Sequence, residues 1–338
     1  LVGLVGSEMC IRDRLNGRPW KEQVEIAIGD VLDPQTLNPA MQGIDAAYYL
    51  IHSMGGANEF SERDVQAATH FAAAAADAGV QTIIYLGGLG DADSNLSEHL
   101  RSRQQTGAAL RQFAVPVTEF RAGMVVGSGS LSFEMMRNLT ERLPVMIAPR
   151  WVYTKTQPIA IRDVLNYLVS ALETPASRGK IVEIGSPDVL TYAEMMHTYA
   201  RIRGLRRLIL RVPVLTPRLS SYWVHWITPV SAGVVTPLIE GLRNELIVRD
   251  PAAESLFPDI KPLDFATALR RALMRVEEGD IETVWSDALA SSRGDVQPVE
   301  LTQEQGLLFE RRQMTVDAPP AAVFGAFCGL GGDRGWPP

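Results

Sequence analysis

Residues 64–90 read DVQAATHFAAAAADAGVQTIIYLGGLG, and this stretch decides the fold. Its first half is rich in alanine, a strong helix former, and Gly79 stands where a helix would end, so a helix is predicted there. Its second half, residues 82–90, is an apolar run that ends in glycines. Such a run is typical of a strand buried on both faces of a parallel sheet, and the preceding helix is then a crossover.

Three more apolar runs lie around this stretch. VEIAIGDVLD (residues 24–33) and DAAYYLIHSM (residues 45–54) precede it, and PVTEFRAGMVVG (residues 116–127) follows it. Each is predicted to be a strand that runs into a small or polar turn. The repeated strand, helix and strand pattern predicts an α/β fold with a doubly wound parallel sheet.

The next part of the chain continues this alternation. A further helix is predicted over residues 163–172, and KIVEIGS (residues 180–186) is predicted to be a strand. Thr191 and Glu194 have the spacing of a capping box, which predicts a helix that begins there and ends near Gly204.

The domain plan follows from changes in composition. Residues 15–275 are expected to form the doubly wound domain, with a smaller substrate-side lobe mainly in residues 176–275. Residues 276–306 are polar and acidic, which is typical of a linker. Residues 307–338 contain a strand-like FERRQMTVDA and an apolar helix VFGAFCGL, so we expect the truncated start of a second, α+β domain.

Composition excludes several classes of function. The chain has 32 basic and 39 acidic residues and a net charge of −7, whereas a nucleic-acid surface needs clustered Lys and Arg. The two cysteines, Cys10 and Cys328, have no metal-ligand spacing, so no metal site is expected. With no long apolar run and no leader-like segment, we expect a cytoplasmic protein that binds a small molecule.

The first fourteen residues do not fit the pattern. Residues 5–14, VGSEMCIRDR, can be back-translated into a string that resembles a transposase adaptor used in DNA sequencing. We therefore interpret residues 1–14 as an artefact and leave them out of the fold prediction. The alternative is an irregular native terminus.

Ligands of a doubly wound sheet bind outside the carboxyl ends of its strands, so residues just after each apolar run are the candidate site. Asp30 could accept a hydrogen bond from an adenine amino group, although capping the next helix would explain it equally well. Small residues after the other strands would let a ligand approach the backbone closely. The predicted binding residues are Asp30, Val31, Leu50, Ile51, His52, Gly87, Gly88, Leu89, Arg103 and Gly123.

The order GDVLD, YYLIHS, IIYLGGLG, EFRAGMVVG and PIAIRDV resembles the atypical short-chain dehydrogenase/reductase family. The likeness runs from about Leu15 to Leu269 and is strongest to the NmrA-like branch and to the accessory subunit of respiratory complex I that has this fold. It implies a Rossmann-like fold and an NAD(P) cofactor. Residues 307–338 resemble the start of a helix-grip domain of unknown function.

Two departures from the family bear on activity. The glycine-rich turn after the first strand, which holds the pyrophosphate, is absent, as if the first strand and this phosphate loop were missing. We therefore expect impaired dinucleotide binding by the chain as printed. The family also uses a Tyr, a Lys four residues later and a Ser after the preceding strand, and here His99, Arg103 and the Gly87–Gly88 pair stand at these places.

The substituted residues leave two functions open. In the first, the protein is an oxidoreductase in which His99 donates a proton and Arg103 holds ribose or phosphate oxygens, since arginine is a poor proton shuttle. Its substrate would be an apolar carbonyl or quinone-like compound near Trp223 and Trp226. In the second, it is a non-catalytic NAD(P)H-sensing regulator or assembly factor. A surface or capping role is the alternative for His99.

Some properties are not predicted by the sequence. The residue that would select NADP over NAD lies at the end of the second strand in such folds, and this position falls near the residues that we interpret as an artefact. The oligomeric state has no sequence signal. The aromatic stretch YWVHW (residues 222–226) is best explained by packing inside the lobe. Peripheral membrane contact through residues 219–242 is its alternative.

Overall fold

The computed structural model describes residues 20–51, 59–91, 96–211, 240–278, 300–304, 307–311 and 318–328. The chain divides into two compact units, Leu1–Gly294 and Asp295–Pro338, which are described separately.

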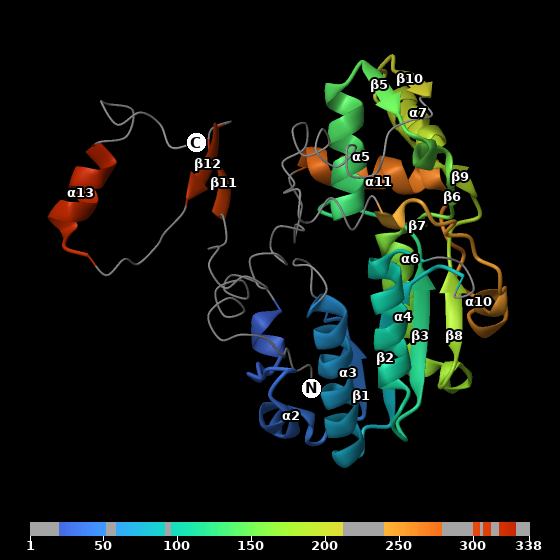
Figure 1. Cartoon of the computed structure of the whole chain (residues 1–338), viewed down its shortest axis with the longest axis vertical. Helices are drawn as coiled ribbons and strands as arrows, with labels where there is room; N and C mark the ends of the chain where they lie inside the picture. Colours follow the sequence, from blue (N-terminus) through green and yellow to red (C-terminus); the bar gives the residue numbers. More distant parts are fainter. Residues whose placement is uncertain are drawn as a thin grey trace. The chain divides into compact units, whose positions relative to one another are not determined.

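The first unit contains a parallel sheet of four strands in the order β1-β2-β3-β8 (Figure 1). The strands are β1 (Ala46–Tyr49), β2 (Thr82–Gly88), β3 (Val117–Ala122) and β8 (Ile181–Ile184). In the register, Tyr49 pairs with Tyr85, Gly88 with Ala122, and Ala122 with Ile184. The predicted parallel sheet is thus confirmed.

Both faces of the sheet are covered by helices, as in a doubly wound fold. One face packs against α2 (Pro34–Met41), α3 (Glu59–Asp77) and α4 (Glu98–Leu110). The other packs against α6 (Ile161–Ser170) and α10 (Ala252–Leu256). Side chains of β2 alternate between the two cores, because Ile83 and Tyr85 face the first and Ile84 faces the second. This alternation explains why the strand is apolar throughout.

Helix α3 confirms the alanine-rich crossover. Its buried residues include Ala68, Ala72 and Ala75, whose small side chains let the helix lie close to the sheet. Gly79 follows the helix with φ +76°, a left-handed conformation that side-chain-bearing residues rarely adopt. The sequence therefore fixes the end of the helix as well as its position.

The prediction of a strand over residues 24–33 was wrong, because in the described structure these residues pair with no strand. Instead, Asp33 donates its backbone N–H to Asp30 O at 2.9 Å, and its carboxylate caps α2 by accepting from Gln35 N at 3.2 Å. A strand forms only where a neighbour supplies a ladder of hydrogen bonds, and no described strand pairs with this segment.

A second core, which we call the lobe core, lies beyond the sheet in the same unit. Its helices are α5 (Leu131–Arg142), α7 (Tyr192–Ile202) and α11 (Phe265–Glu278). Three strand pairs belong to this part of the unit: β4 (Val125–Val126) with β7 (Ile159–Ala160), β5 (Val145–Ala148) with β10 (Leu208–Arg211), and β6 (Lys155–Thr156) with β9 (Leu190–Thr191). Residues 124–152 thus contribute to the lobe core although they precede the predicted lobe, 176–275.

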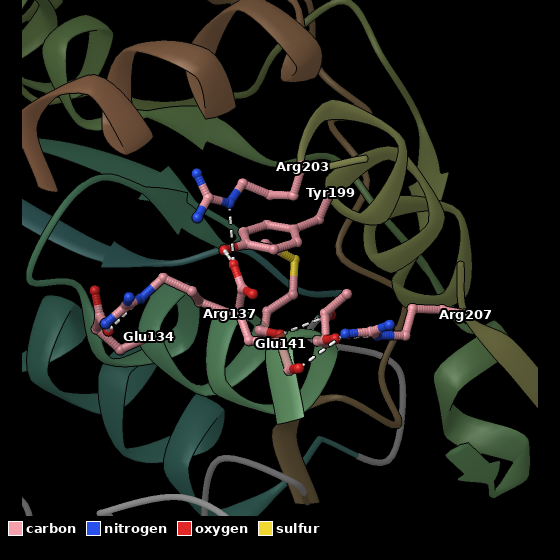
Figure 2. A network of polar contacts seen from close by, with 8 residues as sticks. Glu134, Arg137, Glu141, Tyr199, Arg203 and Arg207 are labelled. Carbon is pink, nitrogen blue, oxygen red and sulfur yellow. Dashed lines mark hydrogen bonds and ion pairs between the residues drawn. The ribbon is translucent and has the colours of Figure 1, made fainter. Parts of the chain in front are cut away.

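Polar contacts join α5 to α7 in the lobe (Figure 2). Glu141 accepts hydrogen bonds from the Tyr199 hydroxyl at 2.7 Å and from Arg203 Nε at 3.1 Å. Arg207 donates to the backbone oxygens of Thr140 and Glu141, which lie at the end of α5. An arginine therefore satisfies carbonyl groups that have no partner within the helix.

The capping box of α7 is confirmed. The Thr191 hydroxyl accepts from Glu194 N at 3.2 Å, while the Glu194 carboxylate accepts from Thr191 N at 2.7 Å. These hydrogen bonds hold the pKa of Glu194 below its usual value. The helix ends at Ile202, just before Gly204 with φ +67°, as predicted.

The second unit contains β11 (Glu300–Glu304), which pairs antiparallel with β12 (Leu307–Arg311), and α13 (Pro320–Cys328). Strand β12 overlaps the strand predicted in FERRQMTVDA, and α13 includes most of the predicted apolar helix. Strand β11 falls within residues 276–306, the predicted linker. None of the helices in the described ranges is long and apolar enough to cross a membrane.

Candidate functional site

The carboxyl ends of β1, β2 and β3 come together at one edge of the parallel sheet (Figure 1). We call the residues at and just after these strand ends the carboxyl edge: residues 50–51, 87–91 and 123. Leu89 N donates to Ala122 O at 2.8 Å, which keeps the segments after β2 and β3 side by side. The structure therefore brings Gly87, Gly88 and Gly123 close together, as the prediction of one site requires.

The paired glycines at the end of β2 make room for two neighbours. A Cβ atom on Gly88 would lie 3.0 Å from Leu100 Cδ2 and 3.7 Å from Arg103 Cβ, so glycine lets α4 pack closely on the strand. A Cβ atom on Gly87 would lie 3.3 Å from Glu119 Oε1. Close packing thus accounts for both glycines, alongside the predicted approach of a ligand.

Arg103 is held against the end of β2. Its guanidinium donates to Leu86 O, just beyond the last residue pair of β1 and β2, and its Cζ lies 5.3 Å from the centre of the Tyr85 ring. The Tyr85 hydroxyl donates in return to Arg103 O at 2.9 Å. Burial raises the pKa of Tyr85, and the Arg103 charge opposes that rise. The predicted cation is therefore fixed at the carboxyl edge.

His99 lies in the first turn of α4 and is half-buried. The helix is capped by Ser97, whose hydroxyl accepts from Leu100 N at 3.3 Å, so His99 is not the capping residue. His99 and Arg103 are four residues apart on one helix, which places them on the same face. The arrangement is compatible with the roles that the sequence suggested for this pair.

Asp30 and Val31 lie in the turn before α2. The Asp30 carboxylate accepts from Leu32 N at 2.9 Å, and the cap of α2 is Asp33 instead. Val31 O accepts from His70 Nδ1 of α3 at 2.9 Å. A local turn therefore accounts for the Asp30 side chain, and contact with adenine stays a prediction.

The remaining predicted residues differ in exposure. The Leu50 side chain is 58% exposed, whereas Ile51 packs against the core beside α3. His52 lies outside the described residues. Leu89 is fully buried among Leu96, Leu100 and Leu246, so only its backbone is available to a ligand.

A segment that the sequence did not predict crosses the carboxyl edge: residues 244–250, which we call the strap. Asn244 Oδ1 accepts from Ser97 N at 3.1 Å. Leu246 O accepts from Gln157 N at 2.7 Å, and Val248 N donates to the Gln157 side chain at 2.9 Å. The ion pair of Arg249 with Asp91 ties the strap to the loop after β2. The strap thus connects α4, the lobe and the sheet.

A buried carboxylate in β3 was also missed. Glu119 forms ion pairs with Arg111 and, at 2.7 Å, with Arg121, and its side chain is 1% exposed. A Cβ atom on Gly107 of α4 would overlap this carboxylate, so that glycine is required by it. Burial lowers the pKa of both arginines. The signal in the sequence was a glutamate inside an apolar strand, which must find a cation.

The described residues contain no group of three or more His, Cys, Asp or Glu side chains placed to hold a metal ion. The candidate site described above consists of backbone groups, glycines, Arg103 and His99.

Comparison with known proteins agrees with this geometry. Residues 11–116 match a family of NAD(P)H-binding domains, a range that includes β1, β2 and α4. The chain thus contains an NAD(P)H-binding domain. A search of curated proteins gives no match.

Solved structures show the same fold. The NADPH-dependent quinone oxidoreductase from Escherichia coli is 14% identical with a TM-score of 0.60, covering 81% of this chain and 100% of that one. Triphenylmethane reductase from Citrobacter sp. is 16% identical with a TM-score of 0.60, covering 78% and 94%. A nucleoside-diphosphate-sugar epimerase from Staphylococcus aureus is 15% identical with a TM-score of 0.59, covering 76% and 88%. At these identities the likeness establishes the fold and nothing more specific.

Proposed function

We propose that this chain is an NAD(P)H-dependent oxidoreductase of the atypical short-chain dehydrogenase type, acting on an apolar carbonyl or quinone-like substrate. The observation that carries the proposal is the end of β2, where Gly87 and Gly88 lie beside the anchored Arg103. This point lies inside the range that matches NAD(P)H-binding domains.

The residues at the carboxyl edge fit the nicotinamide and ribose half of such a cofactor. The half-buried backbone of Gly88 lies at this edge, and a guanidinium can donate several hydrogen bonds to ribose or phosphate oxygens. A bound NAD(P)H would supply the hydride. His99, on the same helix as Arg103, would supply the proton that a reduced carbonyl oxygen requires.

The pyrophosphate half has less support among the described residues. Among the described residues no strand precedes β1, so none of them forms the glycine-rich turn that follows the first strand of such folds and cradles this group. We therefore propose that the chain as printed binds the dinucleotide weakly.

Isothermal titration of NADPH and NADH into this chain tests cofactor binding. We expect a Kd of about 0.1–1 mM, and about tenfold weaker binding for Arg103→Ala, because a charge-assisted hydrogen bond is lost. Arg101→Ala is the matched control, since Arg101 lies on the same helix and is exposed. Equal effects of the two substitutions would contradict the role of Arg103.

The second candidate is a regulator or assembly factor that binds NAD(P)H without chemistry. It is favoured by one observation: the first two turns of α4 carry His99 and Arg103 in place of the Tyr and Lys of the family.

NADPH oxidation with a panel of ketones and quinones separates the two candidates. Slow turnover that is lost in His99→Ala supports the enzyme, with His197→Ala as control because His197 is an exposed histidine of α7. Cofactor binding without turnover of any compound supports the regulator.

A further inference from the structure

Among the residues that the structure describes, three buried polar atoms in the lobe complete no hydrogen bond: Trp151 Nε1, Thr156 Oγ1 and the Tyr192 hydroxyl oxygen. The exposed fractions of these residues are 8%, 0% and 5%. Burying a polar group without a partner costs free energy, and folded proteins leave few such groups. Three of them in one part of a fold therefore need an explanation.

The three side chains come from different elements that meet near the carboxyl edge. The Trp151 and Tyr192 rings contact edge to face with centroids 6.5 Å apart. Burial raises the pKa of Tyr192, and an interaction with the Thr156 side chain opposes that rise, so the two hydroxyls lie close together without completing a hydrogen bond of good geometry. A Cβ atom on Gly123 would lie 3.4 Å from Thr156 Oγ1. The group is thus continuous with the residue that follows β3.

Backbone contacts hold this group in place. Thr156 pairs with Leu190 in the antiparallel ladder of β6 and β9, and it bridges to Leu246 of the strap. Tyr192 is the first residue of α7, directly after the N-cap residue Thr191. The backbones of Thr156 and Tyr192 are therefore fixed by regular structure, while neither hydroxyl completes a hydrogen bond of good geometry with any described residue.

The chemistry of the three atoms defines the ligand. An indole N–H can only donate, and the two hydroxyls can donate as well, so the complementary group is an acceptor oxygen. Trp151 and Tyr192 belong to the apolar lobe core, which also contains Met124 and Met195. An uncompensated carboxylate would be strongly disfavoured in such surroundings, whereas a neutral carbonyl would not.

We propose that Trp151, Thr156 and Tyr192 form the receptor for the carbonyl oxygen of an apolar ketone. The inference rests on the proposed function, because it assigns the substrate-side groups of that site. It places the substrate oxygen next to Gly123, at the edge where the cofactor is proposed to bind.

The test uses the indole N–H signals of the ¹⁵N-labelled full chain, with Trp151→Phe to assign the signal of Trp151. Acetophenone is the probe, and ethylbenzene, which lacks the oxygen, is its control. At about 10 mM, a concentration that would fill most of a millimolar site, acetophenone is expected to move the Trp151 signal and ethylbenzene to leave it in place. Tyr192→Phe and Thr156→Val should each weaken the acetophenone response roughly fivefold.

Two results would overturn the inference. If acetophenone leaves the Trp151 signal unmoved, the three atoms are satisfied by ordered water alone. If ethylbenzene moves it equally, the site recognises apolar shape and not an oxygen. NADPH titration of the same samples keeps the hypotheses apart: NADPH binding without an acetophenone response refutes only the receptor, whereas an acetophenone response without NADPH binding refutes only the cofactor proposal.

Discussion

The sheet and the lobe differ in whether their buried polar side chains have hydrogen-bond or ion-pair partners. Around the sheet, buried groups have partners: Glu119 pairs with two arginines, Thr118 donates to Ser177 O at 3.0 Å, and Ser102 donates to Asp64 at 3.3 Å. Within the described residues, the buried side-chain atoms without a partner all lie in the lobe.

This difference indicates which polar groups serve the fold and which are available for binding. A satisfied buried network holds neighbouring elements in one arrangement, so its loss should appear in stability. An unsatisfied group adds little stability, so its loss should appear in ligand binding. The following substitutions test that division.

The largest loss of stability is expected for Glu119→Gln. The substitution keeps the side-chain volume but leaves Arg111 and Arg121 without their anion, which should lower the free energy of unfolding by about 3 kcal/mol. Urea denaturation followed by circular dichroism measures it.

Glu134→Gln is the matched control, since Glu134 also pairs with an arginine, Arg137, but on a more exposed helix face. It should cost less than about 1 kcal/mol. Equal costs for the two substitutions would mean that the buried network does not determine the stability of the sheet.

A smaller loss is expected for Tyr199→Phe in the lobe, which removes the hydrogen bond to Glu141 (Figure 2). We expect the free energy of unfolding to fall by about 1.5 kcal/mol, because the acceptor is charged. Tyr192→Phe removes a hydroxyl that has no partner and should change stability by less than about 0.5 kcal/mol. A larger loss for Tyr192→Phe would show that its hydroxyl has a structural partner, such as water.

The effect of Tyr199→Phe should also depend on pH. Partial burial would raise the pKa of Glu141, but hydrogen bonds from Tyr199 and Arg203 outweigh it and hold that pKa below 4.5. A depressed carboxyl pKa stabilises the fold above the unfolded value and loses this contribution as pH falls through the folded value. The difference between wild type and Tyr199→Phe should therefore be full at neutral pH and shrink below about pH 4. An unchanged difference at low pH would contradict the ionised acceptor.

Local signals in the sequence predicted the strands and helix ends of the fold. The apolar runs that became β1, β2, β3 and β8, and the Gly79 and Thr191 signals, all act within a few residues of the chain. The run at residues 24–33 failed because a strand also needs a partner, which its own sequence does not supply.

The candidate site was predicted only in part, because it depends on contacts between distant segments. The glycines after β2 and the pair His99 and Arg103 could be placed from their positions after a strand and on a helix. The strap could not, since its contacts with Ser97 and Gln157 join residues about 90 to 150 positions apart. Trp151, Thr156 and Tyr192 likewise belong to three separate elements, and nothing in the sequence shows that their polar atoms lack partners.

The smallest loss among the substitutions that remove a hydrogen bond is expected at the helix caps, which should behave alike in both regions. Thr191→Ala removes the cap of α7 in the lobe, and Ser97→Ala removes the cap of α4 beside the sheet. Each substitution should lower the free energy of unfolding by about 1 kcal/mol, because one N–H at the helix start loses its side-chain acceptor and bonds water instead. Urea denaturation of both variants measures it. Similar costs would confine the difference between the regions to buried groups, whereas a cost of about 3 kcal/mol for Thr191→Ala alone would mean that the cap also holds the buried Tyr192 in place.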